Sequence, residues 1–487
     1  MTGRPVPIGQ ALSRLAAVGP DRPALTVGVE TVTRAELDRL TNRLARAFAV
    51  EGVTQDDLVT IGLPNSVEFV AASIACWKLG AIPQPVSWRL PARELQAIVE
   101  VADSALVVGV DQAIVPGRRT WAAGRRAPGE LDDGPLPPVV SSSWKAPTSG
   151  GSTGRPKLIL SGDRGVVPEE PTRELGRDGC VLIPGPLYHN APFTFASLGL
   201  FYGNHLVLLP RFDAESTLRA VHEHRADFTL LVPTMMIRIL RLPAEVRARY
   251  DLSSLRAMWH MGAPCPEWAK RAWLDWLGPE VVWELYAGTE TQAVAVARGD
   301  EWLKHPGTVG RVTSGQMKVL DPDSLRPLGP QEIGEVFLRC DPGTPPTYRY
   351  LGAEAYTIGD GWESLGDMGW FDEDGYLYLA DRRADMILSG GANIYPAEIE
   401  AALNEHPSVH SCAVIGLPDE DLGQVVHGLM HAMPGASLPD DDELRAFLAE
   451  RLVRYKVPRS FEWTDQPLRD DAGKVRRSLL REERTHP

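Results

Sequence analysis

The sequence predicts an α/β protein with more than one domain, and three observations lead to this fold class. Short apolar runs such as LVTIGLP (58–64) and SALVVGV (104–110) alternate with helical patterns, which is typical of largely parallel sheets. The 487 residues exceed what one hydrophobic core usually supports. After residue 315 the pattern changes to short runs separated by turns, which indicates a smaller antiparallel sub-domain.

The first part of the chain contains the clearest helix signals. Thr33 to Glu36 reads TRAE, a capping box, and apolar residues then recur at helical spacing from Leu37 to Phe48. A second helix is expected in SVEFVAASIACWKLGA, directly after the strand at 58–64. Residues 113–146 are rich in Pro, Gly, Arg and Ser and have no period, so they are expected to form a surface connection.

Further strands are expected in the middle of the chain, in CVLIP (180–184), HLVLLP (205–210), FTLLVP (228–233) and LRAMWHMG (255–262). Beyond residue 315, QMKVLD, GEVFLRC and GYLYLADR resemble antiparallel strands. DEDG fits a hairpin turn between two of them better than a metal site.

The C-terminal part predicts a small α+β domain. PAEIEAALNEH begins with Pro at a helix start, and DDDELRAFLAERL is a helix with acidic residues at its N-terminus. HSCAVIGLP and VVHGLMHAM lie between them and predict strands. A boundary near 381–385 divides the chain into an N-terminal domain of residues 1–382 and a C-terminal domain of residues 383–487.

Charge and cysteine usage limit the partners and the compartment. A formal net charge of −14 argues against nucleic acid or an anionic membrane as the main partner. The five cysteines are scattered without a CxxC pair, which favours buried thiols in a reducing compartment and argues against structural zinc. The N-terminus lacks the apolar core of a signal peptide, and the longest apolar run (69–77) is too short to span a membrane. A cytoplasmic location is therefore expected.

The stretch TSGGSTGRPK (148–157) is the first candidate site. Its glycines let backbone N–H groups converge on an anion, its hydroxyls add donors, and Lys157 adds a positive charge. It is not a Walker A loop, because Arg155 and Pro156 separate Gly154 from the lysine. Most stretches of this composition are ordinary loops, so the loop alone leaves both a phosphate site and a plain turn open.

Five further motifs follow in the order found in the adenylate-forming superfamily, which includes acyl-CoA synthetases, peptide-synthetase adenylation domains and firefly luciferase. The sequence resembles this superfamily from about residue 30 to about residue 480. The resemblance implies a large N-terminal domain and a small mobile C-terminal domain. The motifs that carry it are PLYHNAP (186–192), MGAPCP (261–266), YAGTE (286–290), SLGDMGWFDEDGYLYLADRRADMILSGGANIYPAEIE (364–400) and DDAGKVRR (470–477).

The resemblance implies an ATP-dependent acid:CoA ligase that forms acyl-AMP, releases pyrophosphate and then transfers the acyl group to CoA. Lys474 is the first catalytic candidate, because a mobile point charge suits the α-phosphate and the carboxylate. Glu290 is implied as the Mg²⁺ ligand, since Mg²⁺ prefers carboxylate and phosphate oxygens. His189 is implied to close the acyl pocket or to orient the carboxylate. Taken singly, each of the three also fits an ordinary surface or core role.

The other implied site residues fall into four groups. The tyrosine ring of YAGTE would lie against adenine, and Asp367 with Arg382 would bind the ribose. Trp259 and Met261 are candidates for the acyl pocket with His189, although a plain core role is equally open. Ala384 and Asp385 occupy the hinge for a rotation of the C-terminal domain between the half-reactions, and Ser389, Gly390 and Gly391 form the CoA loop. The full ATP/AMP set is Ser149, Gly150, Gly151, Ser152, Thr153, Gly154, Lys157, Gly262, Ala263, Pro264, Tyr286, Ala287, Gly288, Thr289, Asp367 and Arg382.

Several positions depart from the usual pattern of the superfamily. Gly150 replaces Ser or Thr, Leu365 replaces Thr, Ala287 replaces Gly, Ala384 replaces Asp or Lys, and Ala392 replaces Glu. The combination most resembles a branch that activates bulky steroid, bile-acid or terpenoid carboxylates. Three alternatives stay open: delivery of the acyl group to a carrier protein, a non-catalytic nucleotide-binding relative, and, by fold alone, a luciferase-like oxygenase. The expected partners are a small carboxylic acid, ATP and CoA, and a homodimer is left open.

Overall fold

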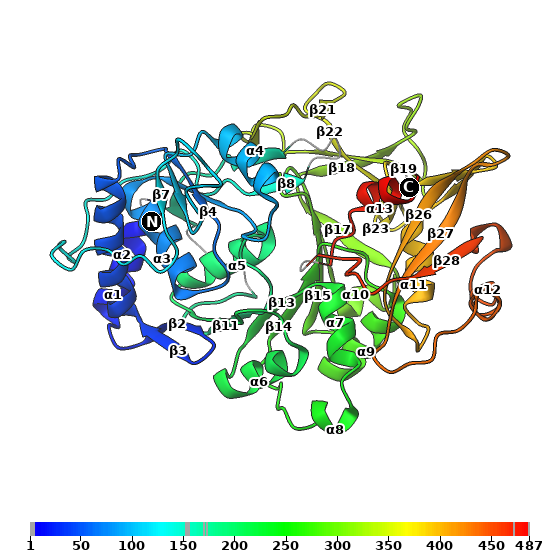
Figure 1. The fold of residues 1–487 in the computed structure, drawn as a ribbon, viewed down its shortest axis with the longest axis horizontal. Helices are drawn as coiled ribbons and strands as arrows, with labels where there is room; N and C mark the ends of the chain where they lie inside the picture. The colour runs from blue at the N-terminus through cyan, green and yellow to red at the C-terminus, as the bar shows by residue number, and fades with distance from the viewer. Residues whose placement is uncertain (1–4, 151–155, 169–170, 172–173, 471–472, 486–487) are drawn as a thin grey trace.

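The larger part of the molecule is organised by one long mixed sheet, in a computed structural model that describes residues 5–150, 156–168, 171, 174–470 and 473–485 (Figure 1). The strands follow the order β18 (Gln316–Leu320), β19 (Gly334–Arg339), β22 (Glu363–Phe371), β23 (Leu377–Arg382), β17 (Thr308–Ser314), β16 (Val294–Arg298), β15 (Val282–Ala287), β14 (Ala257–Met261), β13 (Phe228–Leu231), β11 (Cys180–Ile183), β12 (His205–Leu208), β2 (Pro23–Val27) and β3 (Glu30–Thr33), with β21 (Tyr356–Thr357) beside β22.

The central strands of this sheet are parallel, as the sequence predicts. Strands β2, β12, β11, β13, β14 and β15 run in the same direction, and antiparallel pairing begins at β16. The change from parallel to antiparallel pairing therefore comes before residue 315, where the sequence predicts it. The chain already reverses after β15 through Thr291, whose φ is 54°. The predicted turn at DEDG joins β22 to β23, where the Asp372 N–H donates to the Tyr376 carbonyl and the Tyr376 N–H donates to the Asp372 carboxylate.

Helices cover both faces of the parallel strands, because alternate residues point to opposite sides. Even-numbered residues of β11, such as Leu182, pack in one core with helices α6 (Ala214–His224), α7 (Pro233–Leu240) and α9 (Glu267–Leu277). Val181 and Ile183 pack in the other core with α1 (Ile8–Val18), α2 (Arg34–Val50), α3 (Val67–Leu79) and α5 (Asn190–Phe201). The short helix α8 (Ala244–Arg247) lies at the lower edge in Figure 1, and the short helix α10 (Gly299–Trp302) contributes Trp302 to the first of these cores.

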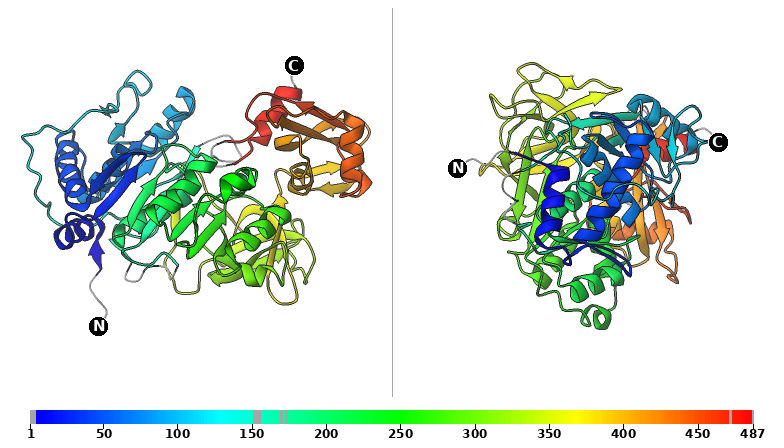
Figure 2. Two further views of the ribbon diagram at one scale, coloured as in Figure 1. Left: turned by 90° about the horizontal axis from the view of Figure 1, so that it is seen from below. Right: turned by 90° about the vertical axis from the view of Figure 1, so that its left-hand side faces the viewer.

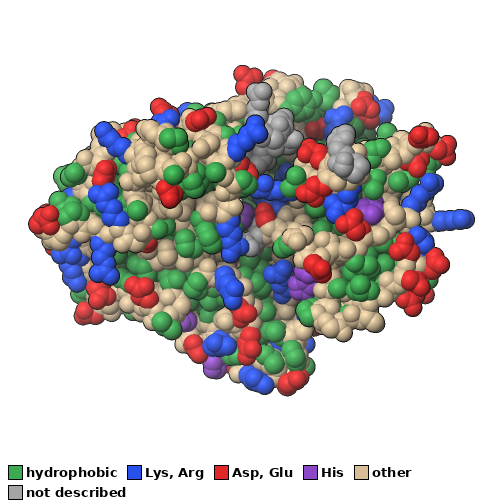
Figure 3. Space-filling view, in the orientation of Figure 1, with side chains coloured by type: hydrophobic (Ala, Val, Ile, Leu, Met, Phe, Trp, Pro, Cys, Tyr) green, Lys and Arg blue, Asp and Glu red, His purple; other side chains and the backbone are tan. Residues whose placement is uncertain are grey.

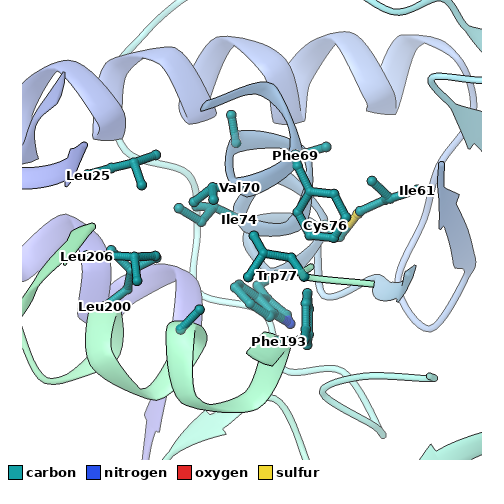
Figure 4. Packing of buried hydrophobic residues seen from close by; sticks show 14 of the residues in the cluster. Leu25, Ile61, Phe69, Val70, Ile74, Cys76, Trp77, Phe193, Leu200 and Leu206 are labelled. Atoms are coloured by element: carbon teal, nitrogen blue, oxygen red, sulfur yellow. The ribbon is translucent and has the colours of Figure 1, made fainter. Parts of the chain in front are cut away.

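Helix α3 is central to the second of these cores. Figure 4 shows its Phe69, Ile74 and Trp77 packed toward Phe193 and Leu200 of α5. This burial explains why α3 is apolar on nearly all sides. The predicted capping box is confirmed at the start of α2, where Thr33 and Glu36 exchange hydrogen bonds.

Smaller sheets complete this body. A parallel sheet contains β5 (Ile82–Pro85), β4 (Leu58–Ile61), β6 (Leu106–Val108) and β7 (Thr120–Trp121), with α4 (Ala92–Ala102) beside it. The others are β20 (Tyr348–Leu351), β9 (Pro156–Ser161) and β8 (Thr148–Gly150), and the pair β1 (Val6–Pro7) with β10 (Val166–Val167).

The prediction that residues 113–146 form only a surface connection is wrong at two places. Trp121 pairs in β7 and is buried. Trp144 and Lys145 are also buried, since Trp144 stacks with Phe193 and its carbonyl accepts a hydrogen bond from Trp77. Because the segment is mostly polar, its composition does not predict that these residues face inward.

Residues 387–485, called the C-terminal unit here, form their own sheet and core at one end of the molecule (Figure 2). Glu400 is buried in the unit and accepts hydrogen bonds from Arg469 and Arg477 at 2.6 and 2.7 Å. No helix within the described ranges is long and apolar enough to cross a membrane. The elements of the unit are β25 (Ala392–Ile394), β24 (Ile387–Ser389), β27 (Gly423–Ala432), β26 (Val409–Asp419) and β28 (Ser460–Trp463), with α11 (Pro396–Leu403), α12 (Asp441–Ala449), the 3₁₀ turn η1 (Arg454–Lys456) and α13 (Arg477–Thr485).

Candidate active site

The predicted site residues gather at the carboxyl edge of the parallel strands. His189 follows β11, Gly262 follows β14 and Glu290 follows β15. Since these strands are parallel, the segments after them lie along one edge, which is where open α/β sheets bind ligands. Figure 3 shows a hollow near the middle of this face of the molecule, with basic, acidic and histidine side chains around it.

Glu290 is a buried carboxylate held by two polar partners. Its side chain is 6% exposed, and it accepts a hydrogen bond from the Tyr350 hydroxyl. The Lys157 ammonium lies 3.4 Å from Glu290 and 3.0 Å from the Tyr350 oxygen, above the tyrosine ring. The site thus joins a carboxylate after β15 to a cation on β9. Tyr350 lies outside the sequence motifs, which therefore do not predict it as a site residue.

A second group combines Tyr286, Asp367 and Arg382. The Tyr286 hydroxyl donates to Asp367 at 2.8 Å, and Arg382 Nε lies 3.3 Å from the other carboxylate oxygen. Burial and then the Asp367 charge raise the pKa of Tyr286 well above its usual value, so the phenol stays protonated. The Asp367 charge also raises the pKa of Arg382. Asp367 and Arg382 are register partners on β22 and β23, which fixes the pair on rigid strands.

Two side chains pack closely against Gly288. A methyl group there would lie 2.3 Å from Leu365 Cδ1 and 2.9 Å from a Glu290 oxygen. The unusual Leu365 therefore packs over the turn that carries Glu290. At Gly262 the requirement differs, since its φ of 87° is strained for other residues, whereas the space beside it is open. Ala263 and Pro264 continue that turn, Ala287 ends β15, and Thr289 lies between Gly288 and Glu290.

Lys474 of the C-terminal unit faces this site. Its backbone pairs with Asp470, and the neighbouring Gly473 lies against Thr234 of α7. Lys474 is exposed to water, yet neighbouring groups lower the pKa of its ammonium: desolvation contributes first and Arg382 second, while Asp470 and Glu290 oppose the shift. Arg382 and Glu290 both act on Lys474, so the lysine lies near both groups described above. Figure 2 shows the segment before α13, in red, reaching back toward the larger body.

This lowered pKa gives a pH prediction. Lys474 loses its proton, and with it the positive charge, at a lower pH than an ordinary lysine at 10.5. If Lys474 acts in adenylation, as the sequence resemblance implies, kcat/KM for ATP in that step should fall on the alkaline side below pH 10.5. In Lys474→Arg, which stays charged, that fall should move to higher pH when each profile is scaled to its own maximum. The same alkaline fall in both enzymes would mean that another group titrates.

In the segment that joins the two units, Arg383 and Asp385 form ion pairs with different units. Arg383 pairs with buried Glu335 of the larger body at 2.8 Å, and its backbone N–H donates to Gly366. Asp385 pairs instead with Arg477 of the C-terminal unit at 2.9 Å. Ala384 thus lies between an anchor on one unit and an anchor on the other.

An aromatic wall lies on the sheet face that packs against α5. Trp259 on β14 and Trp283 on β15 are register partners whose rings stack 5.5 Å apart with an interplanar angle of 7°. Phe195 of α5 lies 6.1 Å from Trp259. Met261, on the same face, is also buried. His189 is the N-cap residue of α5 and its ring lies 4.5 Å from that of Tyr188.

The predicted CoA loop has its described contacts within the C-terminal unit, and part of the predicted phosphate loop lies outside the described residues. Ser389, Gly390 and Gly391 form the β24–β25 hairpin turn, with positive φ at both glycines, and the Gly390 N–H bonds to Leu422 of the same unit. In the phosphate loop, residues 151–155 (Gly151, Ser152, Thr153, Gly154 and Arg155) lie outside the described residues. Of Ser149 and Gly150 only the backbone, in β8, is described.

The donors present suit magnesium bound together with phosphate. Among the described residues no group of three or more His, Cys, Asp or Glu side chains is arranged to hold a metal ion. A single carboxylate fits Mg²⁺, which keeps several waters and takes phosphate oxygens as further ligands. Glu290, beside Lys157, is a buried carboxylate that fits this requirement.

Cations paired with two carboxylates at the edge of a parallel sheet are what a nucleotide-binding enzyme needs. Comparison with known proteins then gives the family. The AMP-binding enzyme family matches residues 12–348, and the AMP-binding enzyme C-terminal domain matches residues 398–474. The chain belongs to this family, and it is an acid–thiol ligase of the acyl- and aryl-CoA ligase class that uses ATP, Mg²⁺ and CoA.

Similar proteins cover nearly the whole chain. A feruloyl-CoA synthase of Amycolatopsis sp. is 35% identical, covering 96% of this chain and 97% of its own. A 2-succinylbenzoate–CoA ligase of Geobacillus kaustophilus is 32% identical, with 96% of both chains covered. The structure of O-succinylbenzoate coenzyme A synthetase from Bacillus subtilis in complex with ATP and magnesium ion matches with a TM-score of 0.81 and 25% identity, covering 96% of this chain and 98% of that chain.

Proposed function

We propose that this enzyme activates a bulky hydrophobic carboxylic acid as an acyl-adenylate and transfers it to CoA, with Lys474 as the residue that promotes the first step. The observation that carries the proposal is the position of Lys474, near Arg382 and Glu290 although it comes from a separate unit. In the first step a carboxylate oxygen bonds to the α-phosphorus of ATP and pyrophosphate leaves. In the second, the CoA sulfur bonds to the acyl carbon, AMP leaves and the thiol proton passes to water.

The residues take separate parts in this proposal. Asp367 accepts from the ribose hydroxyls and Arg382 supports it, while Lys157 and the loop at 149–154 hold the terminal phosphates. Lys474 offsets the repulsion between the carboxylate and the α-phosphate, which are both anionic. Mg²⁺ bound at Glu290 would neutralise phosphate charge. Tyr286, with Gly262 to Pro264, lines the adenine side.

We propose a hinge at Ala384–Asp385 and a domain boundary at 382/383. The exchange of anchors from Glu335 to Arg477 across Ala384 supports this position. Rotation there would carry Lys474 away from the site and bring the turn at Ser389–Gly391 toward it for the second step. Ala384 has only a methyl group at the pivot. The ion pairs of the flanking Arg383 and Asp385 therefore hold the chain on either side of it.

The acid is proposed to have a large ring system, such as a steroid, bile-acid or diterpenoid carboxylate. The wall of Trp259, Trp283 and Phe195 supports ring binding, since broad aromatic faces bury apolar rings well. The relatives favour a second candidate, a one-ring acid, because feruloyl and succinylbenzoate groups are aromatic. A screen for acid-dependent pyrophosphate release decides between them. Selective activity with polycyclic acids supports the first candidate, and activity confined to one-ring acids supports the second.

Trp259 gives a sharper test of the acyl pocket. We expect Trp259→Leu to lower kcat/KM for the preferred ring acid by about tenfold, whereas Trp259→Phe should stay within about threefold. A matched control is Trp302→Leu, which truncates a similarly buried tryptophan in the other core. If Trp302→Leu lowers kcat/KM for the preferred ring acid as much as Trp259→Leu does, the effect is general destabilisation and Trp259 is an ordinary core residue.

We propose the cytoplasm as the setting of this CoA ligase. All five cysteines are free thiols, which suits a reducing compartment. Incubation of the acid and ATP with either CoA or a holo-carrier protein, followed by mass measurement, tests the acceptor. A thioester on the carrier alone would replace CoA by a carrier protein. Sedimentation velocity separates a monomer from a homodimer.

A further inference from the structure

Arg241 links the two units at the end of helix α7. It follows the last residue of α7 and reaches the segment of the C-terminal unit that runs from the end of α11 to the first residues of β26. Its guanidinium donates to three backbone carbonyls there: His410 at 2.8 Å, Val409 at 2.9 Å and Asn404 at 3.1 Å. It also lies 3.7 Å from Met433 Sδ. All partners described for this guanidinium belong to the C-terminal unit.

The other end of α7 touches the C-terminal unit near Lys474. A methyl group at Gly473 would lie 2.7 Å from Thr234 Oγ1, so these two segments approach closely at the residue before Lys474. Gly473 also has a φ of 76°, which glycine adopts without strain. Helix α7 has eight residues and is about 12 Å long at 1.5 Å per residue. One rigid helix therefore contacts both the loop at 404–410 and the turn that carries Lys474.

The contact around Arg241 is shielded from water. Burial lowers the pKa of Arg241, although a guanidinium stays ionised at physiological pH. Burial first, and then the charges of Arg238 and Arg241 with a contribution from His431, lower the pKa of His410 to about 4. His410 is therefore neutral at pH 7 and adds no opposing charge. Hydrogen bonds from a charged donor in such a setting are among the stronger ones in proteins.

A second contact between the units is weaker. Arg476 Nη1 lies 3.3 Å from Glu94, but the arginine side chain is 57% exposed. Exposed pairs of this kind contribute little and are screened by salt. The half-buried Arg241 contact is therefore the better candidate for a determinant of how the units dock.

We infer that Arg241 is a positioning residue that holds the C-terminal unit in the orientation used for adenylation. Its three carbonyl contacts would have to break when the unit rotates about Ala384, so they stabilise one of the two orientations and not both. The inference rests on the proposed role of Lys474 in the first step. Arg241 itself touches neither ATP nor the acid in this account.

The test compares the two half-reactions in Arg241→Ala. We expect acyl-adenylate formation to fall at least tenfold, while thioester formation from supplied acyl-AMP and CoA stays within about threefold of the original rate. The matched control is Arg247→Ala, because Arg247 is near α7 and bonds to Leu242 of its own unit. That control should change neither half-reaction by more than about twofold.

The outcomes separate this inference from the function on which it rests. An equal loss in both half-reactions, or no loss in either, overturns the positioning role of Arg241. Lys474→Ala is measured in parallel: if it spares adenylation, the proposed function itself fails. If Lys474→Ala abolishes adenylation while Arg241→Ala does not affect it, only the Arg241 inference fails. A thermal unfolding curve for each variant identifies loss of fold as the cause.

Discussion

Replacement of Lys474 by alanine is expected to lower acyl-adenylate formation by about a thousandfold. The reason is that the ammonium offsets the repulsion between two anions at the moment when they react, and one such electrostatic group is typically worth 10²–10³ in rate. Thioester formation from supplied acyl-AMP should stay within about tenfold, because the lysine belongs to the first step only. The measurement is single-turnover formation of acyl-AMP, beside release of AMP from acyl-AMP and CoA.

A matched control for this variant is Lys456→Ala. Lys456 is also in the C-terminal unit, but it pairs with Glu398 of the same unit. Both half-reactions should be nearly unchanged in this control. Equal losses in the two half-reactions of Lys474→Ala would show that Lys474 maintains structure and does not act on the reacting groups.

Glu290→Gln is expected to have the second largest effect, a loss of about a hundredfold in adenylation. Glutamine keeps the shape and can still accept from Tyr350, but it removes the charge that binds Mg²⁺ and pairs with Lys157. The Mg²⁺ concentration needed for half-maximal rate should rise. The measurement is pyrophosphate release as a function of Mg²⁺ at fixed ATP.

Glu363→Gln serves as the control for Glu290→Gln. Glu363 is a nearby carboxylate that accepts from Tyr348 and Gln292, on the strand next to β19. Its replacement should leave the Mg²⁺ dependence unchanged. If both variants shift the Mg²⁺ dependence equally, the effect comes from the shared hydrogen-bond network and Glu290 is not the metal ligand.

Much of the fold follows from local sequence signals. The apolar runs that end at Ile183, Leu231 and Met261 are parallel strands, because a strand buried on both faces has no polar alternation. The capping box at Thr33 and the hairpin at DEDG formed as expected, since both depend on residues only a few positions apart. Site residues in motifs after these strands therefore meet at one edge.

The features missed by the sequence depend on distant contacts. Tyr350 joins Glu290 because β20 pairs with β9, far away in the chain. Lys145 is buried and bonds to Asn190 and Thr194 of α5, although its surroundings in sequence are those of a loop. Arg241 carries no local signal at all, since its partners are carbonyl groups of another unit.

Leu365 is a further residue whose packing cannot be predicted from the sequence. It departs from the usual residue, and sequence alone gives no reason for the change. In the structure it packs over Gly288, where an added side chain would have to displace it. Gly288 and Leu365 therefore pack against each other at the turn that carries Glu290, so a change at one position affects the other.

The most direct test of the central claim follows oxygen from the acid. The acid selected by the pyrophosphate-release screen is labelled with ¹⁸O in both carboxylate oxygens and incubated with ATP and CoA. If the carboxylate attacks the α-phosphate, the AMP formed carries one ¹⁸O and the thioester carries the other. Label found in phosphate or pyrophosphate, with none in AMP, would contradict an acyl-adenylate intermediate and the role given to Lys474.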